Sequence, residues 1–585
     1  MKKLLKYFKD YRLSSFFGPF FKLIEALLEL TVPMFVAIII DEAIPSGDVN
    51  QIFRYIAIMF GVGLTGFIFS ITAQYHSARA AIGVTREIGN DLFKHIMHLP
   101  KAEKDALTPA SLVTRMTSDL FQIQAAINIF FRLFLRSPFI VLGSMIMAMQ
   151  IDLRMTAYFV AMIVLLTIVV VGSIYITTPL HGKIRLELDR LVTLTREQIQ
   201  GIRVIRAFRQ EDREQTQFQK QNDILSNDQI KVGRLSNFTN PLTYVVVNSV
   251  LILVIWQGGH FVNEGSLQQG QLVALVNYLL AILIELVKIA MFVLQINRGL
   301  TSANRVVDVL DRSVEAPQFE NPILTAADVA DRPELSPTEE SLVVFKDVAF
   351  QYPDAAEVSL RDVNVSFAQG EFIGITGSTG SGKSTLLSLL TKTYDPTEGQ
   401  ISFNPQAFDT ISRQTLRQQI SVVPQSATLF QGTIRSNLLQ GFPQASDAQL
   451  WQALEDAQAK DFVEAKEGGL DATVEAFGRN FSGGQRQRLT IARALIKPAQ
   501  ILILDAATSA LDYVTEANFQ KVLREKYQDM TIIMVSERTH SIMEADRIIV
   551  LEQGRQIAAD SHEALLENSE VYREIHESQQ VLGVN

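Results

Sequence analysis

The sequence contains no cysteine, and this absence removes a whole branch of chemistry. Without thiols the chain forms no disulfide, offers no thiolate to a metal and has no cysteine nucleophile. It also lacks an excess of positive charge: 53 Lys and Arg residues stand against 62 Asp and Glu residues, for a net charge of −9. Binding to the phosphates of nucleic acid requires surplus Lys and Arg, so nucleic acid is not expected as the main partner. The sequence does not say whether the lack of cysteine is natural or engineered.

Long apolar runs fill residues 1–310, whereas residues 341–585 have the composition of an ordinary globular domain. The mean hydropathy of +0.16 averages the two halves and hides this contrast. A membrane-spanning helix requires roughly 20 mostly apolar residues. Six segments meet this requirement, and we predict spans at about 16–40, 53–75, 127–150, 155–178, 241–263 and 270–297.

Positive charge is distributed unevenly between the connecting segments. Residues 76–126 carry six Lys or Arg and residues 181–240 carry eleven, whereas 45–52 and 261–270 carry none. The positive-inside rule therefore places both long segments, the N-terminus and the C-terminal half in the cytoplasm. The basic start, residues 1–12, is predicted to be a retained cytoplasmic lead-in, with a cleaved signal peptide as the alternative.

Ionisable residues inside a span are costly and are functional candidates by default. Glu285 and Lys288 lie three residues apart in the sixth span, on one helical face. They either neutralise each other in the bundle interior or form a polar patch on a substrate cavity. Glu25 and Glu29 in the first span, and Arg132 and Arg136 in the third, are expected to reach water near the cytoplasmic interface. We therefore do not expect these four residues to have a direct functional role.

The segment Gly-Ser-Thr-Gly-Ser-Gly-Lys-Ser, residues 377–384, follows an apolar strand and precedes a helical run. This context is what a phosphate-binding P-loop requires, because glycines let backbone N–H groups wrap phosphates at a helix N-terminus. Lys383 is expected to reach the β- and γ-phosphates of ATP, and Ser384 to ligate Mg²⁺. The predicted ATP-binding residues here are Gly377, Ser378, Thr379, Gly380, Ser381, Gly382, Lys383, Ser384 and Thr385.

Two further segments complete a recognisable set. Residues 501–512 form an apolar strand that ends in Asp505, a carboxylate able to hold Mg²⁺. Residues 480–488 read Asn-Phe-Ser-Gly-Gly-Gln-Arg-Gln-Arg, in which Ser482 is a good helix cap and two glycines permit close approach of an anion. With the P-loop, these segments resemble the ATP-binding cassette (ABC) family. The six spans with two long cytoplasmic segments resemble its exporter branch.

The resemblance implies a fold class and domain plan. We expect an α-helical bundle of six transmembrane helices with long cytoplasmic extensions in residues 1–311. An acidic, proline-containing linker at 312–340 follows. Residues 341–585 are expected to form an α/β P-loop ATPase domain with an antiparallel β subdomain and an α-helical signature subdomain.

The resemblance also implies roles for residues outside the P-loop. Tyr352 is expected to stack on adenine, and Gln425 to touch Mg²⁺ or the water near the γ-phosphate, so that Ser384, Gln425 and Asp505 are the metal candidates. In the family, the signature segment of one subunit contacts the ATP that is bound to the opposite subunit. In this chain, the residues expected to contact the partner's ATP are Phe481, which replaces the usual Leu, Ser482, Gly483, Gly484 and Gln485. The D-loop, which links the two sites, would be Ser509, Ala510, Leu511 and Asp512.

Two catalytic positions depart from the family pattern. Ala506 occupies the place of the Glu that polarises water, and Glu537 the place of the switch-loop His. Upstream of the signature, residues 474–478 also differ, with Ala476 at the usual Glu position. The resemblance then implies the degenerate subunit of a heterodimer, whose partner is expected to supply an intact Glu and His and to carry an altered signature. An engineered, hydrolysis-deficient homodimer is the alternative.

The resulting expectation is a subunit of an ATP-driven exporter of hydrophobic or amphipathic drugs in a bacterial plasma membrane. Its own ATP site would bind MgATP but hydrolyse it poorly, and the assembled dimer would be the active ATPase. Lipid export, peptide export and an ATP-gated regulatory membrane protein remain open, because polyspecific cavities are built from ordinary apolar and aromatic side chains. A protein with no cysteine protease domain is not expected to process peptides.

Overall fold

The computed structural model describes residues 2–314, 341–353, 355–403 and 406–581. The described residues divide into two compact units. One contains the residues up to 97 together with 107–312. The other contains residues 98–106 together with those after 312. Most of the predicted linker, 315–340, lies outside the described residues.

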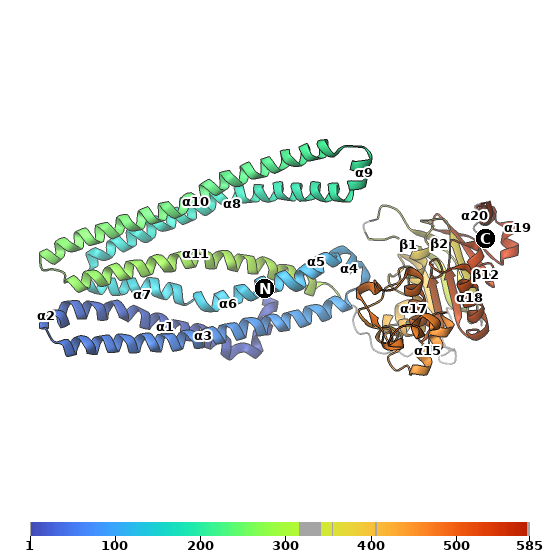
Figure 1. Ribbon diagram of the computed structural model, residues 1–585, viewed down its shortest axis with the longest axis horizontal. Helices are drawn as coiled ribbons and strands as arrows, with labels where there is room; N and C mark the ends of the chain where they lie inside the picture. Colours follow the sequence, from blue (N-terminus) through green and yellow to red (C-terminus); the bar gives the residue numbers. More distant parts are fainter. Residues whose placement is uncertain (1, 315–340, 354, 404–405, 582–585) are drawn as a thin grey trace. The chain divides into compact units, whose positions relative to one another are not determined.

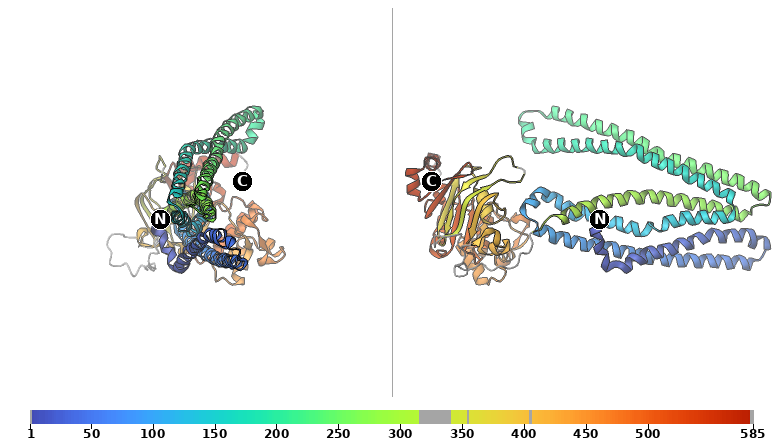
Figure 2. Two further views of the ribbon diagram at one scale, coloured as in Figure 1. Left: turned by 90° about the vertical axis from the view of Figure 1, so that its left-hand side faces the viewer. Right: turned by 180° about the vertical axis from the view of Figure 1, so that it is seen from behind.

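The first unit is built from long helices, shown in Figures 1 and 2. The long helices are α1 (Arg12–Ile38), α3 (Val49–His98), α6 (Leu120–Leu133), α7 (Arg136–Ile151), α8 (Leu153–Gln200), α10 (Glu211–Asn263) and α11 (Gln269–Asp311). The shorter elements are η1 (Lys2–Tyr11), η2 (Ile39–Ala43), α2 (Ile44–Ser46), α5 (Pro109–Thr114), η3 (Arg115–Asp119) and α9 (Ile202–Ala207), whereas α4 (Lys101–Leu107) falls almost entirely in the second unit. Among the described residues, six helical segments are long and apolar enough to cross a membrane. Each of the six predicted spans falls within one of them.

Two groups of helices, a pair and a group of three, dominate the arrangement. α8 and α10 run side by side and are joined at one end by α9, whereas α1, α7 and α11 pack together. The hydroxyl of the buried Tyr278 donates to the carbonyl of Leu30 at 2.9 Å and ties α11 to α1. Asp41 accepts hydrogen bonds from the backbone N–H groups of Gly270 (2.6 Å) and Gln271 (2.9 Å). A carboxylate at the N-terminus of α11 satisfies donors that the helix leaves free.

The third span differs from the uninterrupted helix predicted at 127–150. The helix is interrupted at Phe134 and Leu135, between α6 and α7. Pro138 has no backbone N–H, so the carbonyl of Phe134 loses its helical partner there. The interruption places the first turn of α7, which begins at Arg136, in the middle of the bundle.

The described part of the second unit contains two large sheets, which share a core of buried apolar side chains, and a third sheet of only two strands. The strands are β1 (Ser341–Phe350), β2 (Leu360–Val363), β3 (Ser366–Ala368), β4 (Phe372–Gly377), β5 (Glu398–Phe403), β6 (Gln406–Ala407), β7 (Ile420–Val423), β8 (Gly432–Thr433), β9 (Thr473–Val474), β10 (Ile501–Asp505), β11 (Thr531–Val535), β12 (Arg547–Glu552) and β13 (Arg555–Asp560). One sheet has the order β2-β1-β5-β6, with β3 also paired to β1, and its pairings are antiparallel. The other has the order β13-β12-β4-β11-β10-β7 and is parallel except for β12 with β13.

Helices cover the parallel sheet and form a separate helical subdomain. They are α12 (Lys383–Leu390), α13 (Arg413–Gln419), α14 (Ile434–Leu438), α15 (Asp447–Asp456), α16 (Lys460–Glu464), α17 (Gly483–Leu495), α18 (Tyr513–Lys526), α19 (His562–Asn568) and α20 (Glu570–Val581), with short turns η5 (Phe408–Thr410), η6 (Gly469–Asp471), η7 (Ala476–Gly478) and η8 (Thr539–Ser541). The predicted fold class is confirmed: a six-helix bundle precedes an α/β ATPase domain. Parallel strands present their carboxyl ends at one edge of a sheet, where ligands bind. In this sheet β4 ends in the P-loop and β10 ends in Asp505, beside Val535 of β11.

Residues 98–106 belong to the ATPase unit although their neighbours on both sides belong to the helical one. The hydroxyl of Tyr394 donates to Asp105 Oδ2 at 2.7 Å. Burial, and then this carboxylate, raise the pKa of Tyr394 above its ordinary value, so the phenol keeps its proton as the donor. Asp105, in α4, is thereby tied to the segment that follows α12.

Candidate functional site

The P-loop is a tight turn between β4 and α12 that needs glycine at several positions. Gly380 and Gly382 have φ angles of +84° and +103°, which other residues rarely adopt. A Cβ at Gly382 would lie 2.6 Å from Leu360 Cδ2, so a larger residue would disturb the packing beneath the loop. The Lys383 ammonium donates to the carbonyls of Gly377 (2.8 Å) and Ser378 (2.9 Å), which hold it across the loop. Within the described residues the buried Ser381 hydroxyl has no hydrogen-bond partner.

A pocket of about 950 Å³ opens above this loop and gathers most of the predicted ATP-binding residues. From the predicted set it is lined by Thr379, Gly380, Gly382, Lys383, Ser384, Thr385, Gln425, Asp505, Ala506, Ser509 and Glu537. Gly377, Ser378 and Ser381 are in the same turn but do not line the pocket. A glycine-rich turn, a lysine, an orphaned hydroxyl and a pocket of this volume fit a nucleotide triphosphate.

Three oxygen donors in this pocket fit a magnesium ion bound with the phosphates. Ser384, Gln425 and Asp505 offer a hydroxyl, an amide carbonyl and a carboxylate, which are the hard ligands that Mg²⁺ prefers. Burial raises the pKa of the Asp505 carboxyl, and the Lys383 ammonium opposes that rise. A bound cation would favour the charged carboxylate further. When bound, the metal would neutralise phosphate charge, while these residues orient it.

The two positions that depart from the family pattern, Ala506 and Glu537, lie in the same pocket. Ala506 follows Asp505 with a φ of +47°, and its N–H donates to the Val535 carbonyl at 3.0 Å. Its methyl group can neither polarise nor position water. The carboxylate of Glu537 lies 3.6 Å from Lys383 Nζ and accepts from the Thr379 hydroxyl at 3.3 Å. An acid at this position turns a negative charge toward the phosphate-binding lysine.

Tyr352 lies beside the pocket but does not line it. Its hydroxyl lies 3.2 Å from Thr385 Oγ1, and its ring makes edge contacts with Phe350 and Tyr394, at centroid distances of 4.8 and 5.2 Å. The three rings form one cluster at the end of β1. The structure thus supports a rigid position for Tyr352, and adenine stacking stays a prediction.

The signature segment lies on a different surface of the domain, outside the pocket. Ser482 caps α17 by accepting from the Gln485 N–H at 3.3 Å, and the Gln485 side chain accepts from the Ser482 N–H at 3.1 Å. This reciprocal capping box leaves the first turn of α17 well formed. A Cβ at Gly483 would meet no atom within 4 Å, so the backbone there is open to a ligand. Phe481 is buried in the helical subdomain under the Lys466 ammonium, 4.5 Å from its ring centroid.

The D-loop connects the two surfaces. The N–H of Ser509 donates to the Ala506 carbonyl at 3.2 Å, and the N–H of Leu511 to the Thr508 carbonyl at 2.9 Å. Asp512 then caps α18 by accepting from Thr515 N–H at 3.0 Å. The carbonyl of Ala510 lies 3.0 Å from the position of a Cβ at Gly484, so the D-loop and the signature helix touch through a glycine.

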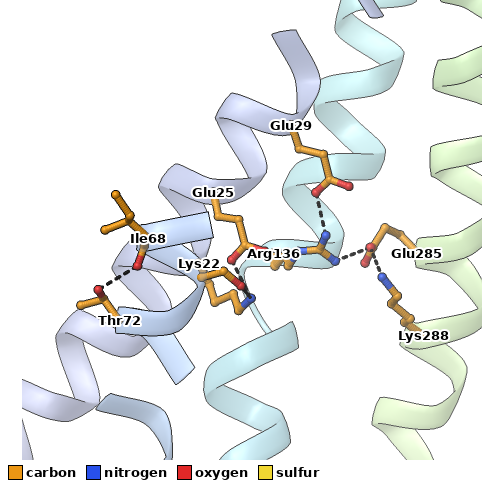
Figure 3. A network of polar contacts seen from close by, with 9 residues as sticks. Lys22, Glu25, Glu29, Ile68, Thr72, Arg136, Glu285 and Lys288 are labelled. Carbon is orange, nitrogen blue, oxygen red and sulfur yellow. Dashed lines mark hydrogen bonds and ion pairs between the residues drawn. The ribbon is translucent and has the colours of Figure 1, made fainter. Parts of the chain in front are cut away.

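A second cluster of functional groups lies among the membrane helices, shown in Figure 3. Its charged members are Lys22, Glu25, Glu29, Arg136, Glu285 and Lys288. They come from α1, α7 and α11, and three positive charges balance three negative ones. Charges in an apolar environment persist when they are paired and hydrogen-bonded.

Arg136 is the centre of this network. It donates to Glu29 Oε2 at 2.7 Å and to Glu285, and its Nε lies 4.0 Å from Glu25 Oε1. Its side chain is 11 % exposed. The expectation that Arg136 reaches water at the cytoplasmic interface is therefore wrong. Carboxylates of the two neighbouring helices α1 and α11 pair with the guanidinium and compensate its charge.

Glu285 and Lys288 do pair, at 2.7 Å, but the pair is part of the larger network. Glu285 also accepts from the Ser137 hydroxyl at 2.6 Å and from Arg136, and it is 2 % exposed. Lys288 is partly exposed. Glu285 is thus a buried carboxylate whose oxygens already have hydrogen-bond partners. Lys288 is the member of this pair that a ligand could reach.

Several residues of both sites escaped prediction. Arg361, Arg538 and Gln553 also line the nucleotide pocket, and Lys22 donates to Glu25 at 2.6 Å and to Ser70 at 3.0 Å. Local sequence gives no signal for the pocket arginines. The signal for Lys22 was available, since a lysine three residues before a glutamate in an apolar span predicts an ion pair.

Comparison with known proteins agrees with this geometry. Residues 15–287 match the model of the ABC transporter transmembrane region, and residues 360–509 match the model of the ABC transporter. The chain is 31 % identical over 561 residues to an uncharacterised ABC transporter ATP-binding protein of Mycobacterium bovis, covering 95 % of this chain and 94 % of the relative. It is 30 % identical over 588 residues to the ATP-dependent lipid A-core flippase of Desulfotalea psychrophila, covering 99 % of both. The solved structure of a bacterial Atm1-family ABC exporter with ATP bound covers 98 % of both chains, with a TM-score of 0.78 at 22 % identity.

Proposed function

This chain belongs to the ABC transporter family as an exporter half-transporter, with a six-helix transmembrane region fused to an ABC ATPase domain, and from that premise we propose that it is the hydrolysis-impaired subunit of a heterodimer. The observation that carries the proposal is a pocket in which the binding groups are intact and the catalytic ones are not. Lys383, Ser384, Gln425 and Asp505 line it together with Ala506 and Glu537. Such a site holds MgATP but lacks the groups that orient water and steady the γ-phosphate.

The signature surface supports the second half of the proposal. Its helix cap is complete and its glycine backbone is open. A helix N-terminus with free N–H groups stabilises a γ-phosphate. This chain would thus lend its signature, Ser482 to Gln485, to a partner that has its own catalytic Glu and His and an altered signature. The site residues and the division into 1–311, 312–340 and 341–585 are parts of the same proposal, as are cytoplasmic termini and a bacterial plasma membrane.

For the cargo we propose hydrophobic or amphipathic drugs, taken up in a cavity beside the charge network. Glu29, which is 54 % exposed and pairs with Arg136 in the network, and Lys288 are the reachable charges. Glu285 supports them from inside. The name of the Desulfotalea relative favours one second candidate, a lipid substrate. An engineered homodimer, peptide export and ATP-gated regulation are further outcomes of the test.

The test compares the chain alone with the complex that it would form with a second half-transporter that has an intact catalytic Glu and His. Alone, it should hydrolyse ATP at background level, because losing a positioned base typically costs about 10²–10⁴-fold. In inverted vesicles containing both subunits, a fluorescent cationic dye should accumulate against its gradient with ATP. Vigorous ATPase of the isolated chain would refute the heterodimer. Flux that runs only downhill would indicate a gate, and movement of labelled lipid without dye transport would indicate lipid export.

A separate experiment tests whether substrate reaches the charge network, by changing two of its acidic residues one at a time. Glu29→Gln should change the preference between cationic and neutral dyes, because this carboxylate is exposed. Glu285→Gln should instead lower the thermal stability of the complex, since it removes one partner from a buried network. Both acids pair with Arg136, but Glu29 is exposed, whereas Glu285 is buried and also accepts from Ser137 and Lys288. If Glu285→Gln shifted the dye preference and Glu29→Gln did not, the cavity would lie on the Glu285 side of Arg136 and not on the Glu29 side.

A further inference from the structure

The last helix of the described chain, α20, holds the loop that carries Glu537. The side-chain amide of Gln579 donates to the Glu537 carbonyl at 2.7 Å and accepts from the Thr539 N–H at 2.9 Å. One side chain therefore bonds the backbone on both sides of Arg538. Both backbone partners have fixed roles, a carbonyl that accepts and an N–H that donates, and they fix the orientation of the amide.

A second contact extends the first into a chain of hydrogen bonds. The Thr539 hydroxyl lies 3.1 Å from Gln579 Oε1 and 2.9 Å from His576 Nδ1. Gln579 Oε1 can only accept, so the single hydroxyl proton goes to it and His576 Nδ1–H donates to Thr539. His576 Nε2 is then the acceptor for the Gln580 amide at 2.9 Å. Every donor in this chain has an acceptor, so α20 and the loop form one bonded unit.

The loop is also held from the opposite side. The Ser541 hydroxyl donates to Glu516 at 2.6 Å, and the Gln520 side chain donates to the Ser541 carbonyl at 3.0 Å, both from α18. His540 stacks on Tyr513 with ring centroids 4.8 Å apart. The backbone from Glu537 to Ser541 is thus anchored at both ends, and the side chain of Glu537, which is 65 % exposed, projects from it.

The anchored backbone directs the Glu537 carboxylate to the P-loop, 3.6 Å from Lys383 Nζ and 3.3 Å from Thr379 Oγ1. Lys383 is the cation that a bound γ-phosphate would use. A carboxylate beside it lowers the positive potential at that point and repels an incoming phosphate. The pair is partly exposed, so water screens this effect and keeps it small.

We propose that Gln579 is a positioning residue: it holds the switch loop so that the Glu537 carboxylate competes with the γ-phosphate of ATP for Lys383. The C-terminal helix thereby sets how tightly this site holds MgATP. This inference rests on the proposed function, in which the site binds nucleotide that it hydrolyses poorly. It assigns to α20 a role in the affinity of the site rather than in folding alone.

The experiment titrates the assembled complex with a fluorescent ATP analogue carrying a methylanthraniloyl group, in the presence of Mg²⁺. The partner's own P-loop lysine is changed to Ala, so that the signal reports this chain's site. Gln579→Met keeps the side-chain length and removes both hydrogen bonds, and it should tighten binding by about two- to fivefold. Glu537→Gln should tighten it by a similar factor. Gln580→Ala, which touches His576 but not the loop, is the matched control and should leave the affinity unchanged.

The double variant separates positioning from a general structural role. If Gln579 acts through Glu537, then Gln579→Met should add little once Glu537→Gln is present, because the two changes remove one interaction. Equal tightening in both backgrounds would overturn the inference, as would weaker or unchanged binding in Gln579→Met with an unaltered melting temperature. Absence of binding by the unmodified chain and by Glu537→Gln alike would overturn the proposed function, and the inference with it.

Discussion

The ATPase domain carries two nucleotide surfaces that differ in what they have kept. The P-loop surface brings Lys383 and its oxygen donors together with Ala506 and Glu537, which stand where the family pattern has a Glu and a His. The signature surface keeps its capped helix and its open glycine at Gly483. Two surfaces of one domain that have diverged in this way are expected to serve two different ATP molecules.

The comparison shows that holding a nucleotide and hydrolysing it depend on separable groups. Binding depends on backbone N–H groups, a lysine and oxygen ligands, which belong to the fold of the P-loop. Hydrolysis needs in addition a carboxylate beside the water and a group that stabilises charge on the transferring phosphate. In the proposed function the second set is missing from this pocket, where Ala506 and Glu537 stand, while the binding groups of the first set line it.

The largest effect is expected on the signature surface. Ser482→Ala removes the helix cap and the hydroxyl that would face the partner's nucleotide, and it should lower the ATPase of the complex at least about tenfold, in line with the loss of one transition-state contact. Ser446 is a matched control, because it caps α15 through the same box with Gln449. Each substitution should cost about 1 kcal/mol of stability. Steady-state ATPase and a thermal melt of both variants check this. Equal loss of activity in both would show that the effect is structural.

A smaller effect is expected at the P-loop surface from the aromatic cluster. Tyr352→Ala should weaken binding of MgATP at this chain's site by about three- to tenfold, because an aromatic pair contributes about 0.5–1.5 kcal/mol. Tyr352→Phe keeps the ring and loses the contact to Thr385, so it should bind almost normally. Titration with the partner's P-loop disabled measures both. A phenylalanine variant as weak as the alanine variant would assign the effect to the hydroxyl.

The smallest effect should come from restoring one catalytic residue. Ala506→Glu should raise total ATPase by less than about twofold, far below the 10²–10⁴-fold of a working general base. A carboxylate polarises water usefully only if the γ-phosphate is in line and its charge is stabilised, and Glu537 opposes that. Adding Glu537→His should help more than either change alone. The ATPase of the complex is measured with the partner's own catalytic Glu changed to Gln. A rate near that of the unmodified complex from Ala506→Glu alone would refute this account of the missing groups.

Local patterns predicted the elements of this protein well. Apolar runs of sufficient length located all six membrane segments, and a glycine-rich turn between strand and helix located the P-loop. These features depend on neighbouring residues, so the sequence displays them directly. The same is true of the Ser482 cap, which a serine three residues before a glutamine predicts.

Contacts between segments that are far apart in the sequence were not predicted from these local patterns. Arg136 meets carboxylates more than a hundred residues away on either side, at Glu29 and Glu285, and nothing in its own span indicates which faces will meet. The rule that arginine reaches water near a membrane surface gave the wrong place for it. Gln579 was missed for the same reason, since its partners at Glu537 and Thr539 lie some forty residues earlier in the chain. Periodicity describes an element but not the element that packs against it.

The most direct measurement compares two single variants in the assembled complex, Lys383→Ala on the P-loop surface and Gly483→Asp on the signature surface. A side chain at Gly483 would meet no atom of its own chain within 4 Å, so its effect would fall on a bound nucleotide. Steady-state ATPase should persist measurably in Lys383→Ala and fall to background in Gly483→Asp. Abolished turnover in Lys383→Ala with near-normal turnover in Gly483→Asp would contradict the account, because the competent site would then be this chain's own.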